Sequence, residues 1–186
     1  VSIDIDTGWL DWAGNPETSS TFTNEGTINL NAVNTAAIEA QTETAPAPYG
    51  HNPATGGPWV AKKEIYGINS GEINGNNNKQ VAMTFVREQA PGVEKQFLTN
   101  AEQGTITMNG NNSMGFSFNV DDLYAEAKNE GKIILNGKNN YGFAFGKGVA
   151  NNHLKVDSVI SNDIKGTIEI NGDNSGGFAL EEMIDS

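Results

Sequence analysis

Residues 104–118 read Gly-Thr-Ile-Thr-Met-Asn-Gly-Asn-Asn-Ser-Met-Gly-Phe-Ser-Phe, and three other stretches align with them without a gap. These stretches are Gly26–Ala40, Gly131–Phe145 and Gly166–Leu180. A fifth copy fits if two residues are dropped, and its matching residues are Gly71, Ile73, Asn77, Val81 and Met83. Self-similarity of this kind predicts a repeat protein built from stacked units.

Each copy places its apolar residues where two short strands would turn them to one side. In the quoted copy these residues are Ile106 and Met108 before the Asn-Gly segment, and Phe116 and Phe118 after it. Successive side chains of a strand point to opposite faces, so residues two apart share a face. We therefore predict two strands per copy, joined by a corner at the Asn-Gly segment, with polar or small residues such as Ser117 facing outward.

Two β architectures fit this pattern. Asn-Gly between apolar runs is a strong hairpin signal and would give an antiparallel meander. However, the polar stretch continues past Gly110 to Ser113, which is too long for a two-residue hairpin loop. A parallel β-helix explains more, because corner residues of successive rungs would lie about 4.8 Å apart. We predict this all-β fold and keep the meander as the alternative.

The β-helix predicts specific roles for the corner residues. Asparagines that stack at one corner can form a ladder of side-chain hydrogen bonds. The asparagines at the sixth repeat position are Asn31, Asn109, Asn136 and Asn171. Glycine at the corner would supply the positive φ that the bend requires.

The copies start at uneven intervals, so we predict a variable third side to each rung. The shortest interval leaves Asn119–Glu130 for that side, which would be a strand end or one helical turn. The longest variable stretch, about residues 41–70, contains four of the 6 prolines. Proline cannot donate a hydrogen bond to a strand ladder, so we expect a protruding loop there.

Charge and composition narrow the partners. The formal net charge is −12 and the pI is near 4.4. A polyanion repels nucleic acids and anionic membrane surfaces, so we expect neither as a partner. No stretch is apolar enough for a transmembrane helix. The lack of cysteine excludes disulfides and is compatible with the cytosol or with a surface protein that crosses membranes unfolded.

Both ends of the chain lie within the repeat pattern. Val1–Ile5 has the pattern of a strand from a further rung, and Gly166–Leu180 runs almost to the last residue. Solenoids close their ends with polar caps, and we find no such element. We therefore interpret residues 1–186 as a single β-helix segment that is part of a longer stack.

The copies at 104–118 and 166–180 resemble the passenger repeats of the large fusobacterial autotransporter adhesins of type V secretion. The resemblance covers the five copies, a little under half of the chain. It implies a right-handed parallel β-helix that is exported through an outer-membrane barrel and exposed on the bacterial cell surface. It also implies attachment to host cell-surface receptors, to host glycans or to other bacteria.

The predicted loop holds the candidate binding residues Tyr49, His51 and Trp59. Aromatic side chains beside a polar frame suit stacking on a sugar or anchoring in a protein pocket. Loops on a rigid scaffold are common positions for binding residues. The alternative is that Tyr49 and Trp59 fold back and cover the solenoid.

Other residues that could carry function receive a structural interpretation. We expect Trp9 and Trp12 to cover the core at a rung edge, and 151–153 to form a solvated loop. The clustered acidic residues are Asp4, Asp6, Asp121, Asp122, Glu181 and Glu182. They match no calcium-loop pattern, so we expect them to face solvent. With only 2 histidines and no cysteine, we expect no zinc site, and we expect no cofactor.

Many parallel β-helices cleave acidic polysaccharides, so an enzyme must be considered. Such enzymes need carboxylates flanking a cleft, or a basic residue beside a metal-neutralised sugar acid. Arg87 is the single arginine, and no carboxylate set recurs from copy to copy. We expect no enzyme and no catalytic residue. A purely structural stalk is the stronger alternative to an adhesin, although a stalk needs only short, uniform loops.

Overall fold

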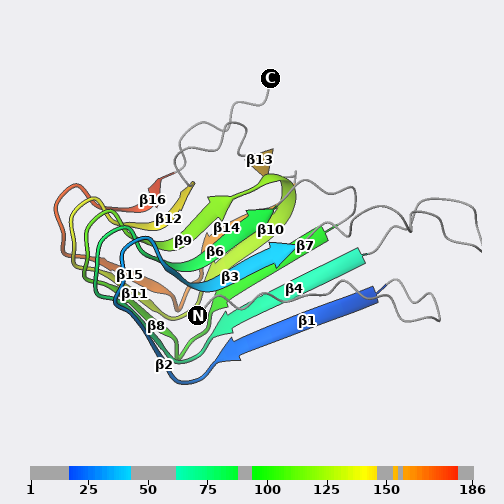
Figure 1. Ribbon diagram of the computed structural model, residues 1–186, viewed down its shortest axis with the longest axis horizontal. Helices are drawn as coiled ribbons and strands as arrows, with labels where there is room; N and C mark the ends of the chain where they lie inside the picture. Colours follow the sequence, from blue (N-terminus) through cyan, green and yellow to red (C-terminus); the bar gives the residue numbers. More distant parts are fainter. Residues whose placement is uncertain (1–16, 43–61, 88–93, 146–152, 155–156, 180–186) are drawn as a thin grey trace, which may run out of the picture.

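The computed structural model describes residues 17–42, 62–87, 94–145, 153–154 and 157–179 (Figure 1). All regular structure in these ranges is β-strand, and the strands form three parallel sheets. Sheet A contains β1 (Glu17–Asn24), β4 (Lys62–Asn69), β7 (Glu94–Asn100), β10 (Asp121–Asn129), β13 (His153–Leu154) and β14 (Val159–Asn162). Sheet B contains β2 (Thr27–Leu30), β5 (Glu72–Gly75), β8 (Thr105–Met108), β11 (Lys132–Leu135) and β15 (Thr167–Ile170). Sheet C contains β3 (Ala36–Thr42), β6 (Val81–Arg87), β9 (Met114–Asn119), β12 (Tyr141–Phe145) and β16 (Gly176–Ala179).

The chain passes through sheets A, B and C in this order five times, and each passage is one rung. Rung 1 is β1–β3, rung 2 is β4–β6, rung 3 is β7–β9, rung 4 is β10–β12, and rung 5 is β13–β16. Every strand pairing is parallel and joins neighbouring rungs. The predicted all-β parallel solenoid is therefore confirmed, and the antiparallel meander is wrong. The right-handed winding stays a prediction.

The link from sheet C of one rung to sheet A of the next is described once. Val120 alone joins β9 to β10, and its side chain is 1% exposed. The third side of rung 4 is thus the strand β10, and the predicted option of a helical turn there is wrong. The protruding loop predicted at about 41–70 is wrong for residues 41–42 and 62–69, which belong to the strands β3 and β4. Residues 43–61 of that predicted loop lie outside the described residues.

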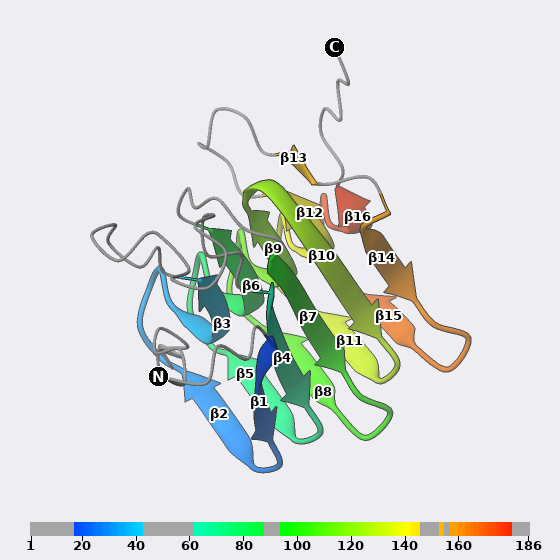
Figure 2. The same cartoon turned by 90° about the vertical axis from the view of Figure 1, so that its right-hand side faces the viewer.

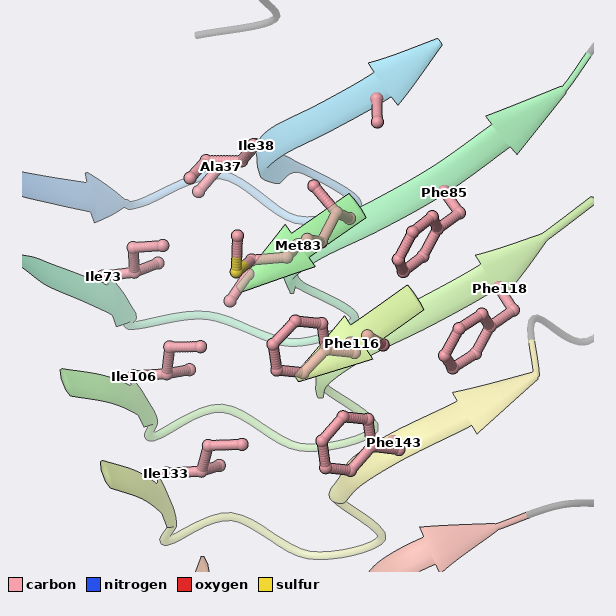
Figure 3. Close-up of a cluster of buried hydrophobic side chains, with 14 of the residues drawn as sticks. Ala37, Ile38, Ile73, Met83, Phe85, Ile106, Phe116, Phe118, Ile133 and Phe143 are labelled. Carbon is pink, nitrogen blue, oxygen red and sulfur yellow. The ribbon is translucent and has the colours of Figure 1, made fainter. Parts of the chain in front are cut away.

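The core consists of columns of apolar side chains that lie one above another across the rungs. Ile73, Ile106 and Ile133 pair in register and are fully buried (Figure 3). Facing them, Phe116 and Phe143 stack with ring centroids 4.7 Å apart and planes inclined by 7°. Burying a side chain of this size contributes about 1.5–3 kcal/mol before the entropy of ordering is subtracted. The inward positions predicted from the repeat are confirmed.

The second rung needs no deletion to match the others. Ile73 pairs with Ile106, Gly75 with Met108, and Met83 with Phe116, so the copy at 71–85 aligns without a gap. The two-residue deletion in the sequence alignment is therefore wrong. It arose because Gly75 occupies a position that is apolar in the other copies. The Met108 sulfur fills the space where a Cβ of residue 75 would stand.

The corner between sheets B and C takes its positive φ from residues other than glycine. Asn112, Asn139 and Lys79 have φ values of 54°, 55° and 56°. Asparagine tolerates this left-handed conformation better than most residues. The prediction that glycine supplies the positive φ is wrong. A Cβ on Gly110 or Gly137 would instead collide with a carbonyl oxygen of the preceding rung, so these glycines permit close stacking.

The outward positions of sheet C are less open than the pattern suggested. Thr84, Ser117 and Ala144 pair in register and are 7%, 6% and 2% exposed. Small side chains in a close-stacked column leave little surface for solvent. Ser117 alternates with the inward residues Phe116 and Phe118, in agreement with its predicted outward position, but neighbouring residues cover it.

Candidate binding surface

The described residues contain few of the sites that the sequence pointed to. Tyr49, His51 and Trp59 lie in 43–61, outside the described residues. Other candidates outside the described residues are Trp9, Trp12, Asp4, Asp6, Asn151, Asn152, Glu181 and Glu182. His153 belongs to β13 and pairs with Asp121 of β10, so the expected solvated loop does not extend to it. No two of the predicted binding residues are therefore brought together by the part of the chain that the structure describes.

Two ladders of asparagine amides run along the stack and make it rigid. The outer ladder is the predicted one and also includes Asn76, with Nδ2···Oδ1 distances from 2.8 to 3.2 Å between neighbouring rungs. The inner ladder was not predicted and follows the last residues of the sheet A strands. It consists of Asn24, Asn69, Asn100, Asn129 and Asn162.

The inner ladder is shielded from solvent from Asn24 to Asn129, whereas Asn162 and the outer ladder are exposed. Asn69, Asn100 and Asn129 are fully buried. Asn100 Nδ2 donates to Asn129 Oδ1 at 2.7 Å and also to the carbonyl oxygen of Gly104 at 3.2 Å. A buried amide is stable only when its polar atoms are paired, so each asparagine here depends on those above and below it.

The inner ladder sets the register of sheet A and hence the residues on its outer face. In each sheet A strand, every second residue before the ladder asparagine points inward. These inward residues are buried, and examples are Ile65, Gln96 and Ala125. The intervening residues point outward. In rungs 2 to 4 we name six of these outward residues the sheet A surface: Glu64, Tyr66, Lys95, Phe97, Tyr124 and Glu126. All six are partly exposed.

Three aromatic rings cross this surface from strand to strand. Tyr66 and Phe97 stack with centroids 4.6 Å apart and planes inclined by 7°. Phe97 then meets Tyr124 at 5.9 Å with an angle of 56°, and Lys95 Nζ lies 4.9 Å from the centroid of the Tyr124 ring. β4, β7 and β10, which carry them, lie side by side (Figure 2). Cross-strand aromatic pairs stabilise a sheet, so this strip is rigid before any partner binds.

A carboxylate fixes the hydroxyl end of Tyr66. The Tyr66 hydroxyl donates to Glu64 Oε2 at 2.7 Å. This hydrogen bond, followed by partial burial and the charges of Glu64 and Glu126, raises the pKa of Tyr66 above its ordinary value. Tyr66 therefore stays a neutral donor at physiological pH. The sheet A surface thus combines an apolar strip with charged groups of both signs, which suits contact with a protein partner.

No other outer face of the described residues carries aromatic side chains in this way. The outward residues of sheet B are Thr27, Asn29, Glu72, Asn74, Thr105, Thr107, Lys132, Ile134, Thr167 and Glu169. Those of sheet C include the small residues Thr84, Ser117 and Ala144. The interior offers little room, since a cavity lined by Phe22, Ile38 and neighbouring residues has a volume of about 10 Å³. Space of that size holds about one water molecule, so this cavity is too small for a larger ligand.

A second repeat in the sequence, which the alignment of the five copies does not include, predicts the sheet A surface. The segments 62–69, 94–100 and 121–129 each end in asparagine and alternate before it. Alignment on that asparagine would have placed Tyr66 beside Phe97 and Lys95 beside Tyr124. An alignment on the first glycine of each repeat does not bring these residues together. Three residues separate Asn100 from Gly104 in rung 3, whereas one residue separates Asn69 from Gly71 in rung 2.

The described residues contain neither a group of metal ligands nor a membrane-spanning helix. Within the described residues, no three or more His, Cys, Asp or Glu side chains are grouped so that they could hold a metal ion. The described part of the chain also has no helix long and apolar enough to cross a membrane.

Comparisons with models of protein families, with curated proteins and with solved structures found no match for this chain.

Proposed function

We propose that this chain is a segment of a bacterial adhesin, the surface-exposed passenger of a type V autotransporter, and that it attaches noncovalently to a partner outside the cell. The observation that carries the proposal is the sheet A surface, a partly exposed aromatic strip on a rigid stack. Tyrosine and other aromatic side chains are enriched where proteins bind each other, and they dominate the binding energy there. The sequence resemblance supplies the adhesin context.

The ring geometry favours a host cell-surface protein as the partner of this strip. One face of Phe97 is stacked on Tyr66, and Tyr124 lies against its other side. A sugar ring needs an open aromatic face for stacking, whereas a protein partner can pack against ring edges and the neighbouring charges. Host glycans and the surfaces of other bacteria are the alternative ligands. Tyr49, His51 and Trp59 form a proposed second contact, because the segment that carries them returns to the sheet at Lys62, shortly before Glu64.

A purely structural stalk is the alternative function. The uniform register of five rungs and the two asparagine ladders would equally suit a stiff rod that carries a distal tip. Polysaccharide cleavage is the less favoured alternative. The adhesin is preferred because a rod has no need of partly exposed aromatic residues on one of its three outer faces.

The test is a binding screen of the purified chain against host receptor ectodomains, a glycan array and intact bacteria. The informative variant is Phe97→Thr combined with Tyr124→Thr, which removes the strip but keeps residues that favour strands. Ile134→Thr is the matched control, because it makes the same kind of change on the outer face of sheet B. We expect the double variant to bind at least about tenfold more weakly, and the control to bind like the parent chain.

A Trp59→Ala variant tests the second contact. It should weaken attachment without altering the fold. If a folded Phe97/Tyr124 variant binds like the parent chain, the sheet A surface is not the binding site. If Trp59→Ala then abolishes binding, the contact lies in 43–61. A folded parent chain that binds none of the three ligand classes would support the stalk.

A further inference from the structure

Ion pairs join rung 5 to rung 4 at three separate places. Lys128 Nζ lies 3.2 Å from Asp163 Oδ2, and Lys132 Nζ lies 2.9 Å from Glu169 Oε2. At the corner between sheets B and C, Lys138 Nζ lies 3.3 Å from Asp173 Oδ2. In each pair the lysine belongs to rung 4 and the carboxylate to rung 5. In a fourth pair the lysine belongs to rung 5 instead. Lys165 Nζ lies 3.0 Å from Glu102 Oε2 of rung 3.

The lower rungs are held together by apolar contacts and ladder hydrogen bonds. Between rungs 2, 3 and 4 the fully buried rings of Phe85, Phe116, Phe118 and Phe143 stack across the interfaces. The buried part of the inner asparagine ladder adds hydrogen bonds there. Among the side chains that the structure describes, no lysine–carboxylate pair joins rungs 1, 2 and 3 to one another. The interface between rungs 4 and 5 also has a ring stack, Phe143 on Phe178, and a ladder hydrogen bond from Asn129 to Asn162. It differs from the lower interfaces in the ion pairs that it adds to these contacts.

Rung 5 has little apolar burial of its own. Its residues Ile170 and Phe178 are 45% and 47% exposed, whereas the equivalent residues of rung 4, Leu135 and Phe143, are fully buried. Its part of sheet A is divided into β13 and β14. The exposed apolar residues of the last rung therefore contribute less burial than their counterparts below.

We propose that rung 5 is an electrostatically fastened segment that opens from rung 4 at high salt or in acid, while rungs 2 to 4 stay folded. Each repeat of a solenoid contacts only its neighbours, so one weakly held repeat can open while others stay folded. Exposed ion pairs are individually weak, and the screening length falls to about 3 Å at 1 M salt, which is close to the N···O distances of these pairs. Rung 5 combines several such pairs with little burial, so it is the rung most sensitive to both conditions. This inference is independent of the proposed adhesin function.

The ionisation of the carboxylates gives the direction of the pH effect. The hydrogen bond from Lys128 is the main cause that lowers the pKa of Asp163, and the one from Lys132 is the main cause that lowers the pKa of Glu169. A group with a lowered pKa in the folded state stabilises fully above its ordinary pKa, which is near 4, and loses this contribution as the pH falls through the lowered value. Rung 5 should therefore open below about pH 4.

The charged groups around these pairs act in the same direction. Glu130 shares Lys128 with Asp163, at 2.7 Å from Lys128 Nζ. Lys138 faces Asp173, and Glu102 faces Lys165. When the carboxylates are protonated, the lysines of rung 4 keep their charges and lose their partners.

The test is hydrogen exchange of the complete chain, read by mass spectrometry for each strand. At constant pH 7, we expect a change from 50 mM to 1 M NaCl to lower protection of amides 159–170 by roughly tenfold. Protection of β7, β8 and β9 should stay unchanged. A second series from pH 7 to pH 3, corrected for the intrinsic exchange rate at each pH, should give the same loss. Equal losses in every rung, or no loss in rung 5, would overturn the proposal.

A charge exchange separates the ion pair from general misfolding. Lys132→Glu should lower protection of rung 5 at 50 mM NaCl, and the double variant Lys132→Glu/Glu169→Lys should restore it. Lys138→Gln should lower it as well, whereas the matched control Lys79→Gln, at the same corner of rung 2, should leave it unchanged. If the double variant does not restore protection of rung 5 while β7 to β9 stay protected, the ion pairs do not hold rung 5 on rung 4.

Discussion

Replacing Asn100 with alanine tests whether the inner ladder holds the rungs together. Asn100 is fully buried, and its Nδ2 donates to Asn129 Oδ1, to the carbonyl oxygen of Gly104 and to that of Lys132. Its own Oδ1 accepts from Asn69 Nδ2 at 2.8 Å. The substitution therefore affects partners in the rungs on both sides.

The expected cost follows from the partners that are left behind. Asn69 Nδ2 keeps its bond to the carbonyl oxygen of Gly71, at 3.3 Å. Asn129 Oδ1 loses its amide donor inside the stack, and a buried unsatisfied acceptor costs about 1–3 kcal/mol. Adding about 1 kcal/mol for the other lost hydrogen bonds, we expect the free energy of unfolding to fall by about 2–4 kcal/mol. The control is Asn109→Ala in the exposed outer ladder. It should lower the free energy of unfolding by less than about 1 kcal/mol.

Urea unfolding followed by circular dichroism measures both variants. The decisive quantity is the difference between Asn100→Ala and Asn109→Ala in the free energy of unfolding. Equal losses would refute the reasoning, because burial would then make no difference to the worth of a ladder amide.

Asn100→Asp extends the test to pH. A carboxylate at this position would face three acceptor oxygens, whereas its protonated form can donate to Asn129 Oδ1. The folded state therefore binds the proton more tightly than the unfolded state, and the pKa of the new group is raised. The stability that the folded state gains from this proton appears as the pH falls through the raised pKa. The loss of stability relative to the parent chain should accordingly be largest at pH 7 and shrink towards pH 4, and a constant loss would contradict this.

Three further predictions follow from the packing and the charges. Ile133→Asp places an unpaired charge at a fully buried position and should abolish the cooperative unfolding transition seen by circular dichroism. Gly110→Ala should lower the free energy of unfolding by about 1–3 kcal/mol, since its Cβ would meet the carbonyl oxygen of Asn77, whereas Gly26→Ala, with nothing within 4 Å, should be neutral. Glu64→Gln should lower the pKa of Tyr66 towards its ordinary value, measured by NMR titration of the ring, because a neutral amide oxygen replaces the charged acceptor.

Much of the fold followed from the sequence. The Ile and Phe positions at 104–118 and their counterparts predicted which side chains point inward and which residues stack, because strand periodicity is a local property of the chain. The outer asparagine ladder followed from the same alignment. The positive φ values did not, since Asn112 and Lys79 adopt them while the glycines serve close stacking between rungs.

The candidate surface and the ion pairs depended on tertiary contacts. Tyr66 stacks on Phe97 and Lys132 pairs with Glu169 only because the chain returns to the same sheet one rung later. The return distance varies, as the neighbouring asparagines of the inner ladder are separated by 45, 31, 29 and 33 residues.

The sequence by itself thus determined a repeating all-β chain and the inward face of most of its strands. The tertiary structure decided which residues from different rungs meet, where the buried ladder runs and which outer face carries aromatic rings. The physical reason is that alternation along a strand assigns each side chain to a face, whereas its neighbour on that face is set by strand register. Register depends on the links between sheets, whose lengths vary, and on the glycines and asparagines that let the rungs stack closely.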